Sequence, residues 1–310
     1  MTVAYITAER YGVDFQDRIN RLIRIDPEET PAFSMFGKVE AKADTHYFQS
    51  ETLAAANKDN AAVQGADVTN ASGDFVAPSN LLNYTQLLEK PFAAATSHSM
   101  TDKPGIGRGK MSTFNHEKAK KYIEMKRDGD AAILSNNERV QPLPDSTTAG
   151  KLRGATRWIT TNALDMSVTQ NQQNFTTKIL TRDMLYYVAK LCFDNGGRPK
   201  HIFTNSSQKL RMNEFTGAPT RDIDSTGSAL SDAIHRIETI AGKQDIIVDQ
   251  YMDQNTILML ELQYWKVAML QAPDFKVKGV TGHADQGFTF MELTVECLAE
   301  KSSGKITNLD

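Results

Sequence analysis

The chain has 310 residues and a formal charge of -3, from 35 Lys and Arg against 38 Asp and Glu, and 40% of its residues are hydrophobic. This predicts a folded protein of one large domain or two ordinary ones, and the near-neutral balance argues against a dedicated nucleic-acid binder. No apolar run reaches the ~20 residues of a membrane span, and no secretory leader is recognisable, so we expect neither membrane insertion nor secretion.

The first 36 residues carry a short amphipathic pattern. Apolar side chains recur at helical spacing at Phe15, Ile19, Leu22 and Ile23. We expect an arm whose apolar face packs against another part of the assembly.

Residues 41–80 are poor in large apolar side chains, of which they contain seven: Tyr47, Phe48, Leu53, Val63, Val68, Phe75 and Val76. Such a segment cannot bury a core of its own, and a structureless loop of this length is uncommon inside a compact domain. Residues 45–49 suit a short strand. The segment is therefore either disordered or a projecting hairpin that a neighbouring molecule orders.

The longest predicted helix runs over about 108–136, with Ser112 or Thr113 as its expected N-cap. Its first part, from Arg108 to Arg127, holds seven basic and two acidic residues, a local balance of +5. Either this is a solvated helix face or it faces a polyanion whose phosphates the lysines contact.

Residues 140–154 contain Pro142, Pro144 and Gly150 and predict a linker. After it the pattern alternates between helix and strand and ends mainly in strands. The expected helices are 177–193 and 206–215, and the expected strands are 200–205, 237–240, 245–249, 256–262, 267–271, 275–280 and 287–298.

A search for catalytic, cofactor and metal motifs gives no candidate residues. The glycines of 105–110 have neither Walker A nor dinucleotide-binding spacing and predict a hinge before the long helix. No two of the six histidines lie within five residues of each other, which excludes a helical His pair. Cys192 and Cys297 are expected to be free, buried thiols.

The order of these parts resembles that of tailed-bacteriophage major capsid (major head) proteins with the Hong Kong 97-like fold. Short segments from about Ile25 to Leu309 carry the resemblance, and their order gives it weight. These segments are 26–37 (DPEETPAFSMFG), 52–56 with 64–67, 82–86 (LNYTQ), 126–136, 199–215, 291–295 (MELTV) and 304–309.

The resemblance implies an α+β fold with an N-terminal arm, an extended β-hairpin loop, a long spine helix in a peripheral domain and an α/β axial domain. The implied limits are 1–36 for the arm, 37–92 for the extended loop, 93–150 and 275–310 for the peripheral domain with the spine helix at about 108–136, and 151–274 for the axial domain.

The resemblance also implies a structural protein, with no enzymatic activity, cofactor or membrane partner. Such a subunit self-assembles into hexamers and pentamers of an icosahedral head around double-stranded DNA, in the host cytoplasm, and portal, scaffolding and decoration proteins are further candidate partners. The candidate subunit-interface residues are Phe15, Ile19, Leu22, Tyr47, Phe48, Leu53 and Lys58. The candidate lumen-facing, non-specific DNA contacts are Lys118, Lys120, Lys121, Lys126 and Arg127.

Two alternatives stay open on the sequence. One is the shell protein of an encapsulin-type nanocompartment, which has the same fold and holds protein cargo. The other is a soluble enzyme with a disordered insertion at residues 41–80.

Overall fold

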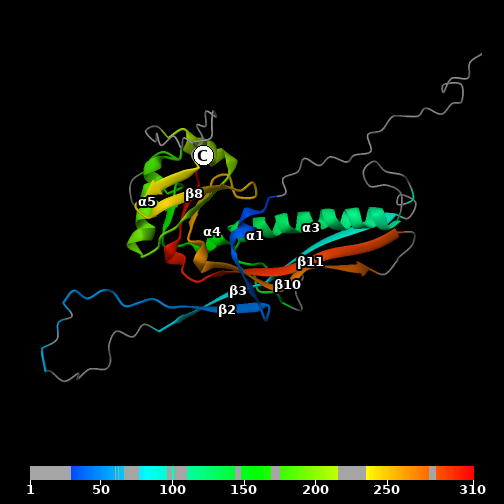
Figure 1. Cartoon of the computed structure of the whole chain (residues 1–310), viewed down its shortest axis with the longest axis horizontal. Helices are drawn as coiled ribbons and strands as arrows, with labels where there is room; N and C mark the ends of the chain where they lie inside the picture. The colour runs from blue at the N-terminus through cyan, green and yellow to red at the C-terminus, as the bar shows by residue number, and fades with distance from the viewer. Residues whose placement is uncertain are drawn as a thin grey trace, which may run out of the picture. The chain divides into compact units, whose positions relative to one another are not determined.

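A computed structural model describes residues 29–59, 61, 63–65, 77–95, 100, 110–143, 148–168, 175–215, 235–278 and 284–310 (Figure 1). The predicted helical arm residues and the glycine hinge at 105–109 lie outside these ranges. The chain divides into two compact units. The small unit holds the described residues of Lys90–Glu124 and Phe275–Thr289, and the large unit consists of Glu28–Glu89, Met125–Asp274 and Phe290–Asp310.

The large unit contains a mixed six-stranded sheet with the order β5-β12-β9-β6-β8-β7. Its strands are β5 Ala163–Asp165, β6 His201–Thr204, β7 Arg236–Thr239, β8 Gly242–Val248, β9 Ile257–Leu260 and β12 Gly304–Thr307. The β5–β12 and β6–β8 pairs are parallel, and the others are antiparallel. The strands predicted at 200–205, 237–240, 245–249 and 256–262 are thus confirmed, with small shifts at their ends.

Helix α5, Arg182–Asp194, packs its apolar face on this sheet. Met184, Val188 and Cys192 are fully buried there against Ile202 of β6 and Ile306 of β12. The approach of α5 to β12 is so close that a Cβ on Gly304 would lie 2.4 Å from Val188 Cγ1. A glycine is therefore required where the helix crosses the strand.

The predicted start of α5 at residue 177 is wrong, because Thr181 has extended backbone angles and the helix begins at Arg182. Helix α6, Ser206–Asn213, begins where predicted, since the Asn205 side chain accepts a hydrogen bond from the Ser207 N–H.

A four-stranded sheet has the order β1-β10-β11-β4. Its strands are β1 Gly37–Glu40, β4 Gln86–Ala95, β10 Trp265–Lys278 and β11 Ala284–Cys297. The prediction of separate strands at 267–271 and 275–280 is wrong, because β10 is continuous through Pro273. In the described chain, β1 pairs only with residues 266–269 of β10. Pro273 lies beyond these residues, so its lack of an N–H group costs no hydrogen bond with β1.

Strands β2, Thr45–Ser50, and β3, Ser79–Tyr84, form an antiparallel two-stranded ribbon (Figure 1). The strand predicted at 45–49 is confirmed. The segment 82–86, which carries part of the resemblance, contains the end of β3 and the first residue of β4. Residues 51–59 that follow β2 are exposed.

Helix α3 comprises 25 residues, Lys110–Leu134, and contributes residues to both units. Ser112 and Thr113 lie within it, so neither is its N-cap. No helix in the described part of the chain is long and apolar enough to span a membrane. The remaining short helices are α1 Pro31–Met35, α4 Ala155–Trp158, η2 Leu262–Tyr264 and η3 Glu300–Ser302.

The interpretation of 140–154 as a linker is wrong at its C-terminal end. Val140 and Lys151 form an isolated β-bridge, and Leu152 is buried. Gly154 packs directly on the end of α3, where a Cβ would lie 2.1 Å from the Ser135 carbonyl oxygen. Its lack of a side chain is a packing requirement, which the sequence pattern alone does not distinguish from flexibility.

Candidate functional site

The base of the β2–β3 ribbon is fixed to the large unit by a buried asparagine. The Asn83 side chain is fully buried on β3, and its Nδ2 donates hydrogen bonds to the Val295 carbonyl at 2.9 Å and to the Arg153 carbonyl at 3.2 Å. Its Oδ1 accepts from the Arg153 N–H at 2.9 Å and from the Tyr84 N–H at 3.0 Å. One side chain therefore joins β3, β11 and the segment before α4.

Polar contacts on both sides reinforce this attachment. His46 Nε2 lies 2.5 Å from Glu296 Oε1 of β11, and Thr85 Oγ1 hydrogen bonds with Glu292 of the same strand. Arg139 Nη1 donates to the Leu82 carbonyl at 2.6 Å. The ribbon thus leaves the large unit from a rigid, hydrogen-bonded base.

The predicted interface residues of the ribbon fall into two groups. Tyr47 and Leu53 are 66% and 94% exposed, and Lys58 is exposed as well. Phe48 is only 7% exposed and packs on Trp158 with ring centroids 5.7 Å apart. Tyr47 and Phe48 differ because successive side chains of a strand point to opposite faces. Phe48 therefore packs within its own subunit and stabilises it.

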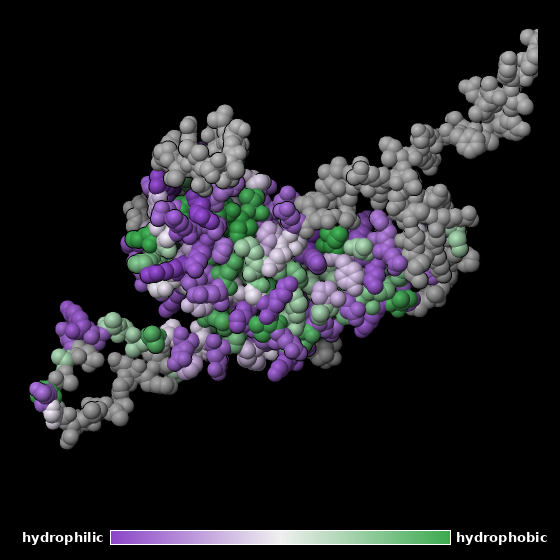
Figure 2. Space-filling model, viewed as in Figure 1, coloured by the Kyte–Doolittle hydropathy of each residue, from purple (hydrophilic) through white to green (hydrophobic). Residues whose placement is uncertain are grey.

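The exposed segment after β2 carries hydrophobic as well as hydrophilic residues, as Figure 2 shows. Phe15, Ile19 and Leu22 of the predicted interface set lie outside the described residues.

The basic stretch of α3 is partly neutralised within the small unit. Lys118 Nζ lies 4.5 Å from the ring centroid of Phe275, which packs with Phe92 and Phe114 in an aromatic cluster. Lys121 Nζ forms a 2.6 Å ion pair with Glu124. Lys118 and Lys121 therefore both have partners in their own subunit.

Nearby lysines lower the pKa of the Glu124 carboxyl. Burial raises its pKa, but the hydrogen bond and charge of Lys121, with the charges of Lys120 and Lys90, outweigh burial and lower the pKa. The local field of the helix is therefore positive even beside its acidic residue.

The large-unit part of the same helix holds the other two candidates. Lys126 is exposed. The Arg127 guanidinium lies 5.4 Å from the ring centroid of Tyr251, a packing interaction that leaves its charge in place. Among the five candidates, Lys126 is thus the most accessible to a polyanion.

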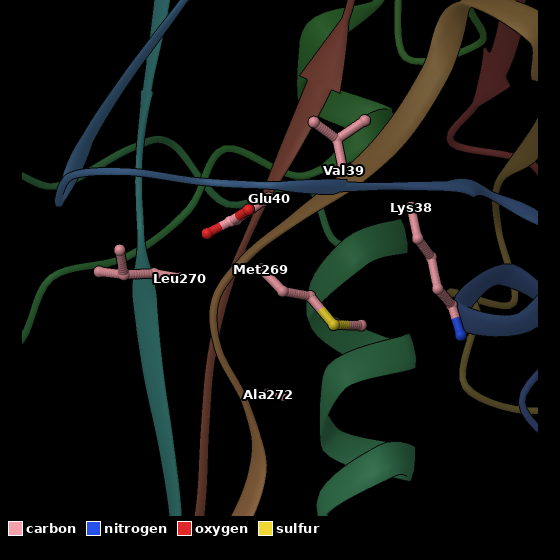
Figure 3. Close-up of a pocket in the computed structure, with 6 residues that line it drawn as sticks. All are labelled: Lys38, Val39, Glu40, Met269, Leu270 and Ala272. Atoms are coloured by element: carbon pink, nitrogen blue, oxygen red, sulfur yellow. The ribbon is translucent and has the colours of Figure 1, made fainter.

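A shallow hollow of ≈ 410 Å³ lies between β1 and β10 (Figure 3). Its lining consists of Lys38, Val39, Glu40, Met269, Leu270 and Ala272. Lys38 and Glu40 extend in different directions in Figure 3, and the Lys38 ammonium lies over the ring of Phe33. The two charged side chains of the lining therefore do not converge on a common point.

The described part of the chain holds neither a metal-binding group nor a reactive thiol. Within the described ranges, no group of three or more His, Cys, Asp and Glu side chains could hold a metal ion. Cys192 and Cys297 are free and buried, as predicted. Burial raises the pKa of Cys192 to about 12 and also raises the pKa of Cys297, so neither is a thiolate nucleophile at neutral pH.

Comparisons with known proteins agree with this structural picture. The chain is 22% identical to the major capsid protein of Escherichia phage Phieco32 over 291 residues, covering 80% of this chain and 81% of the relative.

Solved structures show the same fold at low sequence identity. A chain from Microbacterium phage Oxtober96 matches with a TM-score of 0.65 at 11% identity, over 98% of this chain and 99% of that one. A chain of the holo-SrpI encapsulin complex from Synechococcus elongatus PCC 7942 matches with a TM-score of 0.57 at 10% identity, over 100% and 97%. The α+β fold is therefore the Hong Kong 97-like fold shared by phage capsid proteins and encapsulins, as the resemblance implied.

The SU10 major capsid protein family matches residues 2–310. Since this match spans nearly the whole sequence, the chain belongs to the SU10 major capsid protein family and is a structural component of a phage virion.

Proposed function

We propose that this major capsid protein self-assembles into hexamers and pentamers of an icosahedral head that encloses double-stranded DNA, and that it assembles in the host cytoplasm without enzymatic activity of its own. The observation that carries the proposal is the β2–β3 ribbon, which has a rigid base and an exposed end. A lone two-stranded ribbon is marginally stable in water. Contact with a neighbouring subunit would bury Tyr47 and Leu53 and would stabilise the ribbon.

The domain limits implied by the resemblance are part of this proposal: 1–36 for the arm, 37–92 for the extended loop, 93–150 and 275–310 for the peripheral domain, and 151–274 for the axial domain. Five strands of the six-stranded sheet come from 151–274, and residues 304–307 add β12 to it. This pairing favours assigning β12 to the axial domain.

Non-specific contact with packaged DNA is proposed for α3. The exposure of Lys126 and the positive field around Lys120 support it, because phosphate contacts need accessible charge and no base reading. The other three candidates already have contacts within the subunit, but they still add positive charge to the helix. These are Lys118, Lys121 and Arg127. Portal, scaffolding and decoration proteins are further proposed partners of the shell.

The assembly proposal is tested by replacing residues 52–77 with a short Gly/Ser linker that leaves β2, β3 and Asn83 in place. We expect a folded subunit that forms no closed particles by negative-stain electron microscopy, while the unaltered protein forms them. A matched control exchanges the exposed Lys243 of β8, which lies outside the ribbon, for Gln and should still assemble. Normal particles from the 52–77 replacement would refute the role of the ribbon.

The similarity to the SrpI encapsulin favours one second candidate, a shell that holds protein cargo. The family match supports the phage head. Nucleic-acid quantification and mass spectrometry of particles purified from infected cells distinguish the two, since a phage head retains double-stranded DNA and a nanocompartment retains a cargo protein.

A further inference from the structure

A fully buried carboxyl on α3 caps a helix far away in the sequence. Asp130 Oδ1 accepts a 2.6 Å hydrogen bond from the N–H of Phe33, 97 residues earlier. Phe33 lies in the first turn of α1, and Thr30, at the N-cap position of that helix, makes no side-chain capping bond. Asp130 therefore does for α1 what a local Ser, Thr or Asp usually does. The assembly surfaces described above do not use this side chain.

A second buried carboxyl lies against the first. Asp249 directly follows β8, is fully buried, and accepts a 2.9 Å hydrogen bond from the Tyr251 N–H on its Oδ1. Its own N–H donates to the Thr204 carbonyl at 2.9 Å, which fixes it to β6. The two carboxyls lie at the same junction, because Arg127, three residues before Asp130, packs on Tyr251, two residues after Asp249. Asp249 also acts on the Asp130 carboxyl through its side chain and its charge.

Each of these two carboxyls has one oxygen without a partner. Oδ2 of Asp130 and Oδ2 of Asp249 are buried and have no hydrogen-bond donor among the described residues. Two ionised carboxylates are both acceptors, so they can hydrogen bond only when one of them is protonated. Two negative charges buried side by side would otherwise repel strongly.

Charged groups on the surrounding elements do not relieve this repulsion. These groups are Lys126, Arg127 and Asp128 on α3, Glu29, Lys38 and Glu40 beside α1 and on β1, His201 on β6, Asp245 on β8, Tyr251 and Asp253 after β8, and Glu292 on β11. Lys38 stacks on Phe33 and Arg127 on Tyr251. Within the described ranges, neither buried carboxyl has an ion pair with Lys, Arg or His.

We propose that Asp130 and Asp249 form a proton-operated latch that joins α1, α3 and the end of β8, closed while the two side chains share a proton and released when both are charged. Release withdraws support from α1, which connects the residues before it to β1. Any effect of the latch on shell assembly rests on the proposed function, whereas the latch itself is a property of the subunit.

The direction of the pH effect follows from the sign of the pKa shift. Burial, and then the hydrogen bond and charge of Asp249, raise the pKa of Asp130 to about 8, against smaller lowering effects of the Phe33 and Ala32 N–H groups. A carboxyl whose pKa is raised on folding stabilises the fold fully below its ordinary value near 4. That contribution is lost as pH rises through about 8, so the latch loosens on the alkaline side.

The test is hydrogen–deuterium exchange of the peptide that covers residues 29–40, measured on the full-length protein from pH 5 to 9 and corrected for intrinsic exchange. For the unaltered protein we expect protection of α1 to fall by up to about tenfold per pH unit and to level off above about pH 9. In Asp130→Asn, Oδ1 still accepts from Phe33 while Nδ2 donates permanently to Asp249, so protection should be independent of pH. Asp249→Asn should behave in the same way.

The matched control is Asp253→Asn, at an exposed aspartate on the same loop, and it should keep the pH dependence of the unaltered protein. Equal slopes in Asp130→Asn and the unaltered protein would overturn the proposal. Infrared spectroscopy of the unaltered protein serves if both buried variants fail to fold. A protonated-carboxyl band that persists at pH 7 and disappears with a midpoint near pH 8 supports the latch, and its absence at pH 7 refutes it. These subunit measurements are independent of whether shells form.

Discussion

Phe48 packs on Trp158 at a centroid separation of 5.7 Å, while its neighbour Tyr47 stays 66% exposed. Two adjacent aromatic residues of one strand thus serve different interactions. One stabilises the subunit, and the other is available to a neighbouring molecule.

This difference predicts opposite effects of two alanine substitutions. Phe48→Ala should lower the free energy of unfolding by about 3–5 kcal/mol, because it removes a buried ring and leaves a cavity. Tyr47→Ala should leave subunit stability within about 0.5 kcal/mol and should reduce the yield of particles. Chemical denaturation of the subunit and particle counts by electron microscopy give the two readouts. Equal stability loss in both variants would contradict the assignment.

Asn83 is predicted to be the main polar attachment of the ribbon. Asn83→Ala removes four hydrogen bonds and leaves buried backbone groups of Arg153 and Val295 without that partner, so we expect about 2–4 kcal/mol of destabilisation in a denaturant titration. Asn80→Ala is the control on the same strand, because Asn80 is exposed and accepts one hydrogen bond from Gln49. An equally small effect in both variants would show that the buried contacts are dispensable.

The basic helix can be tested by separating its accessible charge from its packed charge. Lys120→Gln with Lys126→Gln should reduce the DNA retained by particles and lower the salt dependence of DNA binding by about one unit of slope per lost phosphate contact. Lys118→Gln should mainly lower subunit stability, by about 0.5–1 kcal/mol, because Lys118 stacks on Phe275. Filter binding over a salt series and thermal melts measure these effects. If the double variant binds and packages DNA as the unaltered protein does, the lysines are only a solvated face.

Gly304 is predicted to be intolerant of any side chain. In Gly304→Ala the new methyl group would lie 2.4 Å from Val188 Cγ1 and 2.8 Å from Cys192 Sγ, so α5 must move off β12. We expect a loss of about 1–3 kcal/mol in the free energy of unfolding. Gly37→Ala is the comparison, since its Cβ would lie 3.3 Å from the flexible Lys266 side chain and at an ordinary contact distance of 3.6 Å from the Trp265 carbonyl oxygen. Similar melting temperatures for the two variants would contradict the close packing.

Local periodicity was sufficient to predict α3, α6, the first strand of the ribbon and most strands of the six-stranded sheet. It missed α1, β1 and β4, which are short or mainly exposed and are held by partners distant in the sequence. β1, for example, pairs with residues 266–269. Pro273 led to the prediction of two strands where the structure has one, β10. The sequence does not show that β1 pairs only with residues 266–269, so that Pro273 lies beyond this pairing.

The residues that fix the site were harder to predict than the elements that carry it. Asn83 bonds to Val295, 212 residues away, and Asp130 bonds to Phe33, 97 residues away. A buried polar side chain has no local pattern that distinguishes it from an exposed one in the same strand or helix. Tyr47, Leu53 and Lys58 are exposed in the subunit, and their place in a subunit interface stays a prediction. The burial of Phe48 depends on Trp158, which is distant in the sequence.

The position of β12 determines when the six-stranded sheet can be completed during synthesis. β12 lies between β5 and β9, yet residues 304–307 leave the ribosome after every other strand of that sheet. Until translation reaches them, β5 and β9 lack the strand that joins them, and the α5 core lacks Ile306. Nascent or prematurely terminated chains therefore cannot complete this sheet, which keeps partial translation products from offering a finished subunit to a growing shell.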